Sequence, residues 1–334
     1  MHNPHVVRAK SNRTAMAGIV AALGWIVAQP LSAAEPASAR PSLQEATAQL
    51  KVPPDWFDSV TIHWDMNKPW KDARLEVRRL LALDEAANRE AVKITWLYSQ
   101  KGDIGDGHEL PMYLFMSGNY VWALQEYPRH LLKSAGKGPT HEYMCFASCY
   151  AHFGEFARAM EIVDRAAKDL PPDPWRIRSR ATVEDMRGDI YAMMGDIDKA
   201  KTAYGEAMRI LPTSTQPYGR QTLQREVAKI RRKVDLLTFT AWDKAALRDG
   251  TYSARIFAYA EDKEMVVMVT IRAGKIVDIK LRHWEKIELN ATKIIPRRII
   301  EKQSLKVDVI SGATVTSQAI INGTYEALKQ AGLK

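Results

Sequence analysis

Residues 308–317 read DVISGATVTS, and this stretch decides the structure expected for the C-terminal part of the chain. Apolar residues come first, small residues follow, and a helical pattern begins directly afterwards, which predicts a short strand, a tight turn and a helix. Free N–H groups and the dipole at a helix start favour a bound anion. We therefore expect a phosphate site here, where Gly312 lets the main chain approach closely and where Thr316 and Ser317 cap the helix.

Three half-buried strands are predicted ahead of this stretch, because apolar and polar residues alternate there. They cover residues 251–259, 264–272 and 276–283. A compact turn at residues 273–275 joins the second strand to the third. A helix over residues 291–302 follows, and a final helix ends near Gln330. Residues 241–334 are therefore predicted to form a small α+β domain.

The same stretch resembles the covalent flavinylation motif of the FMN-binding domain family. That family includes the flavin-bearing subunits of sodium-pumping quinone reductases and of Rnf-type electron-transport complexes. The motif residues are Asp308, Ser311, Gly312, Ala313, Thr314, Thr316 and Ser317. Further agreement comes from Asp249-Gly250-Thr251-Tyr252, Gly274-Lys275-Ile276, His283, Glu285 and residues 299–304. The resemblance therefore extends over the whole predicted α+β domain.

The resemblance implies that the phosphate of FMN forms an ester with the hydroxyl of Thr314. A magnesium-dependent flavin transferase that uses FAD would install it. The residues that would then serve recognition and positioning are Asp308, Ser311, Gly312 and Ala313, and Thr316 would lie close to the phosphate. A covalent bond suits an exported protein, because dilute surroundings cannot replace a cofactor that dissociates. The alternative for Thr314 is an ordinary threonine at a helix start.

The residues expected around the flavin ring are less clearly indicated by the sequence than the attachment residue. His283 and Glu285 are candidates for contacts at the flavin edge, with plain surface positions as the alternative. Trp284 could stack on the isoalloxazine ring or belong to the core. After Glu285 the chain reads KIEL over residues 286–289, where the respiratory subunits often carry Thr-Pro-Gly. We therefore expect the outer edge of the flavin to be lined differently.

Residues 76–238 keep a helical period, which predicts an all-α domain. Small and aromatic residues recur there at the spacing of a tetratricopeptide repeat. The closest match consists of Gly188, Tyr191, Gly195, Ala200, Tyr204, Ala207 and Pro212. An upstream copy has Ala147, Tyr150, Gly154, Ala159, Val163, Ala166 and Pro171, and a weaker one has Gly118, Ala123 and Tyr127. Residues 222–237 are expected to close an array that either binds a partner or acts as a spacer.

Residues 1–34 are typical of a secretory signal peptide. Three basic residues, Arg8, Lys10 and Arg13, precede an uncharged apolar run over residues 15–28. This run is too poor in strongly apolar residues for a comfortable membrane span, and Ser32-Ala33-Ala34 offers a cleavage site. We predict cleavage after Ala34, with an uncleaved anchor as the alternative. Both place the protein outside the cytoplasm, for example in the periplasm, and residues 35–75 are expected to be irregular.

Charge and cysteine content narrow the possible partners. The formal net charge of +9 is spread along the chain without a long basic block or a nucleic-acid module, so no nucleic-acid partner is expected. No other stretch is apolar enough for a membrane span once the signal is removed. Cys145 and Cys149 lie one helical turn apart without a Cys-x-x-Cys-His haem motif. We expect them to pack between helices, with a disulfide as the alternative.

These features together favour an exported electron carrier with covalent FMN, whose repeat domain docks a redox partner. The alternatives are the flavin module of an extracytoplasmic reductase and a redox-sensing scaffold built on the repeats. We assign no catalytic residue and no metal ligand, because no acid and base pair of a dedicated reductase is evident. The expected partners are the flavin transferase and other redox proteins.

Overall fold

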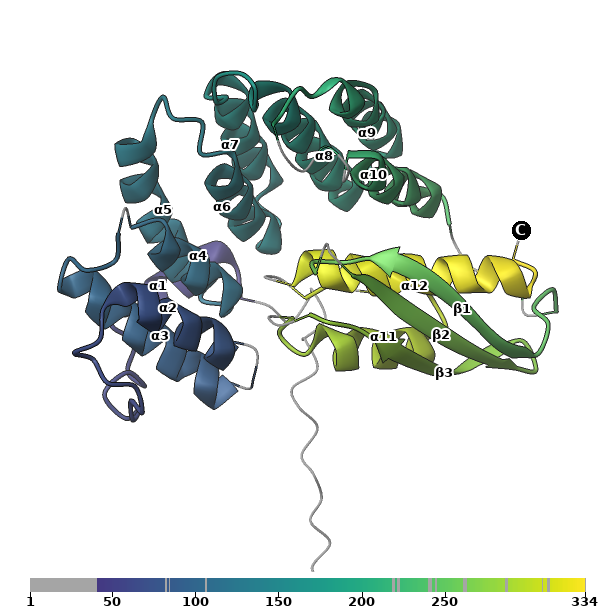
Figure 1. Cartoon of the computed structure of the whole chain (residues 1–334), viewed down its shortest axis with the longest axis horizontal. Helices are drawn as coiled ribbons and strands as arrows, with labels where there is room; N and C mark the ends of the chain where they lie inside the picture. The colour runs from purple at the N-terminus through teal and green to yellow at the C-terminus, as the bar shows by residue number, and fades with distance from the viewer. Residues whose placement is uncertain are drawn as a thin grey trace, which may run out of the picture. The chain divides into compact units, whose positions relative to one another are not determined.

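The chain forms a helical array followed by a small α+β domain, as the sequence predicts (Figure 1). This is a computed structural model that describes residues 41–334, except for residues 82, 84, 106, 218–219, 221–222, 240–241, 244, 261–262, 286–287, 308, 311–312 and 334. The predicted signal peptide lies outside the described residues. So do three residues of the flavinylation motif, Asp308, Ser311 and Gly312.

The array consists of helices that pack mainly against their neighbours in sequence. They are α1 (Leu43–Gln49), α2 (Trp70–Leu81), α3 (Glu85–Gln100), α4 (Glu109–Met116), α5 (Tyr120–Ser134), α6 (Thr140–His152), α7 (Phe156–Lys168), α8 (Arg176–Met194), α9 (Ile197–Ile210) and α10 (Leu223–Leu237). A short 3₁₀ turn, η2 (Leu211–Thr213), follows α9. Within the described part of the chain, no helix combines the length and the apolar content that crossing a membrane requires.

The first helix corrects one prediction, because residues 35–75 are not irregular throughout. Helix α1 lies inside that range, and α2 begins at Trp70. A capping box starts α1: the Glu45 N–H donates to the Ser42 hydroxyl at 3.2 Å, and the Ser42 N–H donates to the Glu45 carboxylate at 2.7 Å. A helix of two turns is too short to show a period, so only the Ser-x-x-Glu spacing could have revealed it.

The pair α8 and α9 shows how the repeat spacing works. A Cβ atom built on Gly188 would lie 2.5 Å from the ring of Tyr204, so only glycine allows this approach. Ala200 and Ala207 of α9 are fully buried, and Gly195 ends α8 in the left-handed conformation at φ 81°. The upstream pair α6 and α7 likewise buries Ala147, Ala159, Val163 and Ala166. The predicted repeats are confirmed at these positions.

Both cysteines lie on α6 and are buried free thiols, which agrees with the packing role expected for them. Burial raises the pKa of the Cys149 thiol well above its ordinary value. This thiol therefore stays protonated at neutral pH and behaves as a small apolar group.

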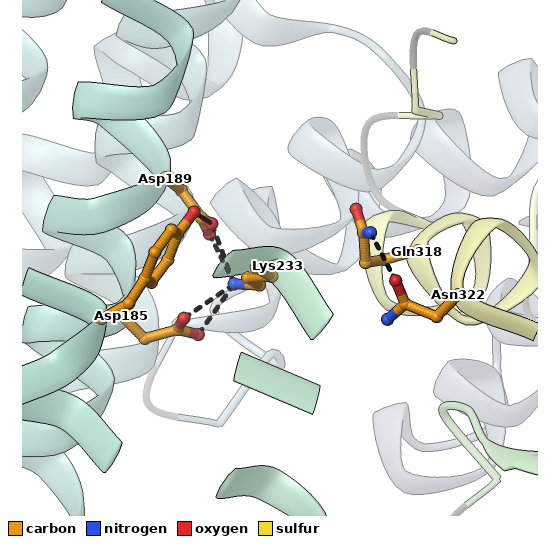
Figure 2. A network of polar contacts seen from close by, with 6 residues as sticks. Asp185, Asp189, Lys233, Gln318 and Asn322 are labelled. Carbon is orange, nitrogen blue, oxygen red and sulfur yellow. Dashed lines mark hydrogen bonds and ion pairs between the residues drawn. The ribbon is translucent and has the colours of Figure 1, made fainter. Parts of the chain in front are cut away.

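Helix α10 closes the array through an ionic cluster with α8 (Figure 2). The Lys233 ammonium lies 2.8 Å from the Asp185 carboxylate and 2.9 Å from the Asp189 carboxylate. The Tyr204 hydroxyl of α9 donates to Asp189 at 2.7 Å. Burial raises the pKa of Asp185 to about 6, against the lowering effect of Lys233. One cluster thus links three successive helices.

The α+β domain is built on an antiparallel sheet in the order β1-β2-β3. Its elements are β1 (Gly250–Phe257), β2 (Glu264–Arg272), β3 (Lys275–Arg282), α11 (Ala291–Lys302) and α12 (Thr314–Ala331). They confirm the three predicted strands and the helix over residues 291–302, apart from the exact strand ends. Ala273 and Gly274 form the predicted turn, with φ of 48° and 68°. Positive φ at both central residues is typical of a tight hairpin turn.

Helices α11 and α12 pack on one face of this sheet. Burial alternates along β2, and its core side chains Met265, Val267, Val269 and Ile271 are almost inaccessible. A Cβ atom on Gly323 of α12 would lie 2.4 Å from Cγ2 of Val267. The helix backbone at Gly323 therefore rests directly on the central strand.

Candidate functional site

A strand was predicted directly before α12, but the described residues of this segment form none. Residues 306, 307, 309 and 310 lie outside the sheet, so this part of the prediction is wrong. The edge of β3 is occupied by a side chain instead. The Gln303 amide accepts the Ile276 N–H at 2.9 Å and donates to the Ile276 carbonyl at 2.7 Å. Ile310 likewise donates its N–H to a side chain, the Ser317 hydroxyl, at 3.1 Å.

Helix α12 begins at Thr314, which is earlier than the predicted caps allow. Its N-cap is Ala313, which forms no side-chain cap. Thr316 and Ser317 are therefore not capping residues, and that prediction is wrong. They lie in the first turn, where Thr316 donates its hydroxyl to the Glu285 carboxylate at 2.5 Å and Ser317 accepts from Ile310. Their hydroxyls hold the surrounding chain rather than the free N–H groups of the helix.

The three hydroxyl side chains of this turn differ sharply in accessibility. Thr316 is 1% exposed and Ser317 is fully buried, whereas Thr314 is exposed to solvent. Ala313, the residue before it, is buried. Thr314 is thus accessible to solvent at the helix start, where a phosphate would meet N–H groups without intrahelical partners. Among these three hydroxyls, only Thr314 is placed for an enzyme to modify.

Glu285 lies just after β3 and binds two other segments. One carboxylate oxygen accepts the Ala260 N–H at 2.8 Å, and the other accepts the Tyr259 N–H at 3.2 Å and the Thr316 hydroxyl. The alternative of a plain surface position is therefore wrong for Glu285, because its carboxylate accepts three hydrogen bonds. Glu285 connects residues 259–260, which follow β1, to the first turn of α12.

The residues beside Glu285 place aromatic surface near this junction. Trp284 is 40% exposed, so its alternative role as a core residue is wrong. The Lys263 ammonium and the Arg282 guanidinium lie 5.5 and 5.8 Å from the centre of its ring. Tyr259, whose N–H binds Glu285, is 64% exposed. Tyr259, Lys263 and Arg282 were not predicted as site residues; the one signal for them in the sequence is an aromatic residue at the end of a predicted half-buried strand.

His283 carries an unusual feature for this part of the domain. Its Nδ1 atom is buried without a hydrogen-bond partner among the described residues. A buried polar atom in that state is costly unless a ligand or water completes it. With an exposed hydroxyl at a helix start and exposed aromatic rings at the Glu285 junction, the described residues fit a phosphate-bearing aromatic cofactor. Stacking of Trp284 on the flavin and contact of His283 with it remain predictions.

The fold and this site define a protein of helical repeats followed by an α+β domain that presents one threonine at the start of its last helix. The comparisons with known proteins identify both parts. Residues 262–329 match the FMN-binding domain, and residues 151–231 match the tetratricopeptide repeat-like domain. The chain thus contains an FMN-binding domain behind tetratricopeptide-like repeats, and FMN is the cofactor that this supports. Strand β1 lies outside the matched stretch but pairs with β2 along its whole length.

One curated relative resembles a limited part of the chain. The NADH:acrylate oxidoreductase of Vibrio harveyi is 37% identical over 86 residues. These residues make up 25% of this chain and 8% of that protein, so the relative is far longer than the shared region. No solved structure matches the chain significantly.

Proposed function

We propose that this protein is an exported electron carrier with FMN bound covalently through its phosphate to Thr314. The observation that carries the proposal is the contrast within one helical turn of an FMN-binding domain. Thr314 is exposed, whereas Thr316 and Ser317 are buried and hydrogen-bonded. A modifying enzyme would meet one of these three hydroxyls.

The attachment is a phosphoryl-group transfer from FAD. The Thr314 oxygen forms a bond to the phosphorus that carries the riboflavin part, the bond to the AMP part breaks, and the hydroxyl proton is released. The first-turn N–H groups of α12 would stabilise the negative charge of the ester. When bound, FMN supplies one- or two-electron transfer, while the protein supplies position and electrostatics.

A covalent bond to the cofactor is useful to a protein that is exported. Residues 1–34 carry the pattern of a signal peptide, and outside the cytoplasm a lost cofactor is diluted beyond recovery. An ester bond makes retention independent of the free FMN concentration. The repeat array would then dock a redox partner on its surface, a common use of stacked helical pairs.

A second candidate is the flavin module of an extracytoplasmic reductase. The similarity to an NADH:acrylate oxidoreductase favours it, because a related domain there belongs to a protein named for substrate reduction. Steady-state assays separate the candidates. A carrier reduces only protein acceptors, whereas a reductase module oxidises a reduced donor with a small unsaturated acid as acceptor.

The direct test uses Thr314→Ala together with Thr251→Ala, another exposed threonine of the same domain. Both are produced for export in a host that contains a flavin transferase. We expect Thr251→Ala to be yellow and reducible, and Thr314→Ala to be folded, colourless and inactive in electron transfer. A flavin retained by denatured Thr314→Ala would refute attachment at this residue. A scaffold would be favoured by two results together. Thr314→Ala would bind a partner as the wild type does, and the wild type would show no redox activity.

A further inference from the structure

Glu285 lies at the meeting point of three segments that are far apart in the sequence. Its carboxylate accepts two N–H groups from residues 259 and 260 and one hydroxyl from Thr316. Hydrogen bonds to an ionised acceptor are stronger than those between neutral groups. A neutral amide at this position would offer one acceptor oxygen instead of two, so at least one donor would lose its partner.

The Thr316 bond acts on the helix that carries the attachment residue. Thr316 is 1% exposed and lies two residues after Thr314 in the same turn. A first turn has few intrahelical hydrogen bonds of its own and frays readily without additional support. The α12 backbone is held on β2 at Gly323, well beyond this turn. The Glu285–Thr316 bond therefore supports the part of the helix that the Gly323 contact does not reach.

We propose that Glu285 is the positioning residue for flavin attachment: it fixes the first turn of α12 through Thr316 so that the Thr314 hydroxyl meets the FAD phosphate in one orientation. This rests on the proposed attachment at Thr314. Proximity and orientation contribute to a transfer rate only when the nucleophile is held in place. Loss of the bond should slow the transfer step itself, although Glu285 need not touch the cofactor.

The experiment uses the full-length mature chain with a purified flavin transferase, FAD and Mg²⁺. Initial rates of FMN incorporation are measured against the concentration of the acceptor chain. The variants are Glu285→Gln, Thr316→Val, their double mutant, and Thr316→Ser, which keeps the hydroxyl. Glu264→Gln is the matched control, because its carboxylate belongs to the same domain and lies 3.8 Å from Arg255.

We expect Glu285→Gln and Thr316→Val each to lower the maximal transfer rate about tenfold, which corresponds to the loss of one charge-assisted hydrogen bond. The acceptor concentration that gives half the maximal rate should stay unchanged. The double mutant should be no slower than the slower single mutant, because both remove the same bond. Thr316→Ser and Glu264→Gln should transfer at nearly the wild-type rate.

Three results would overturn the proposal. These are normal rates in both Glu285→Gln and Thr316→Val, additive losses in the double mutant, or a defect confined to the half-maximal acceptor concentration. The last pattern would indicate fewer folded acceptors rather than a misplaced hydroxyl. If Glu285→Gln does not fold, the contrast between Thr316→Val and Thr316→Ser decides the question alone. A wild-type chain that accepts no FMN would instead refute the attachment at Thr314, which separates the two failures.

Discussion

The α8–α9 pair and the α12–β2 contact both pack a side chain against a helix backbone at a glycine, but only the second lies in the FMN-binding domain. Gly188 faces the Tyr204 ring within a local hairpin, whereas Gly323 faces Val267 across a long stretch of chain. In the repeats, the spacing of small residues specifies shape, and polar groups close the array. In the FMN-binding domain, the close approach at Gly323 packs α12 on the central strand. Close packing serves architecture in the repeats, and under the proposed attachment at Thr314 it also holds the helix that carries the cofactor.

The largest loss of stability is expected from a substitution at Gly323, where α12 packs on β2. Gly323→Ala should destabilise the flavin domain by about 2–3 kcal/mol, because Val267 is fully buried in the central strand and cannot move away. Hydrogen exchange of α12 and β2 peptides should measure this. Gly205→Ala is the control: its Cβ would meet nothing within 4 Å, so it should stabilise α9 by up to about 1 kcal/mol. Equal stability of both variants would contradict the contact.

The second largest loss of stability is expected when the Lys233 ammonium, which links α10 to α8, is removed. Lys233→Met leaves the Asp185 and Asp189 carboxylates side by side without their cation, which should cost about 2 kcal/mol and loosen α10 from α8. Local exchange in α10 is the measurement. Lys199→Met removes an exposed pair with Asp196 and should leave stability nearly unchanged. A comparable loss in both variants would mean that the cluster has no special role.

A smaller effect is expected at the repeat glycine. Gly188→Ala places a methyl group against the Tyr204 ring, but the ring can shift, and alanine favours a helix by about 1 kcal/mol. We expect a net loss of about 1–2 kcal/mol by denaturant unfolding followed through α8 and α9. A loss as large as that of Gly323→Ala would show that the two contacts are equally rigid.

The smallest effect concerns pH. Burial raises the pKa of Asp185 from 3.8 to about 6. The folded array thus holds this proton more tightly than the unfolded chain, so the stabilisation is complete below pH 3.8 and is lost as the pH rises through 6. Relative to Asp185→Asn, the wild type should lose about 1 kcal/mol between pH 4 and pH 7, after allowance for partial exposure. Parallel stability curves of the two proteins would refute the raised pKa.

Regular spacing explains why much of the fold could be predicted from sequence. The period of the repeats, the alternation along β2 and the Ala273-Gly274 turn are local properties that side-chain size and φ preference dictate. The absence of residues 309–310 from the sheet could not be foreseen, because the edge of β3 is taken by the Gln303 amide. Pairing at a sheet edge depends on which distant group arrives there.

The sequence likewise predicts some features of the candidate site and not others. The motif predicts Thr314 as the attachment residue, which stays a prediction, whereas the hydrogen-bond partners of its neighbours could not be predicted. Serine and threonine near a helix start suggest caps, but Thr316 bonds instead to Glu285, 31 residues earlier, and Ser317 bonds to Ile310. Sequence gives residue types at a helix start, while the partner of each hydroxyl follows from tertiary structure.

The most direct test of the central claim is the mass of the exported chain produced together with a flavin transferase. Tryptic cleavage after Lys306 and Lys329 releases residues 307–329, whose hydroxyl residues are Ser311, Thr314, Thr316, Ser317, Thr324 and Tyr325. Fragmentation of this peptide should place one FMN, less one water, on Thr314. An unmodified peptide, or FMN located on another of these hydroxyls, would contradict the account.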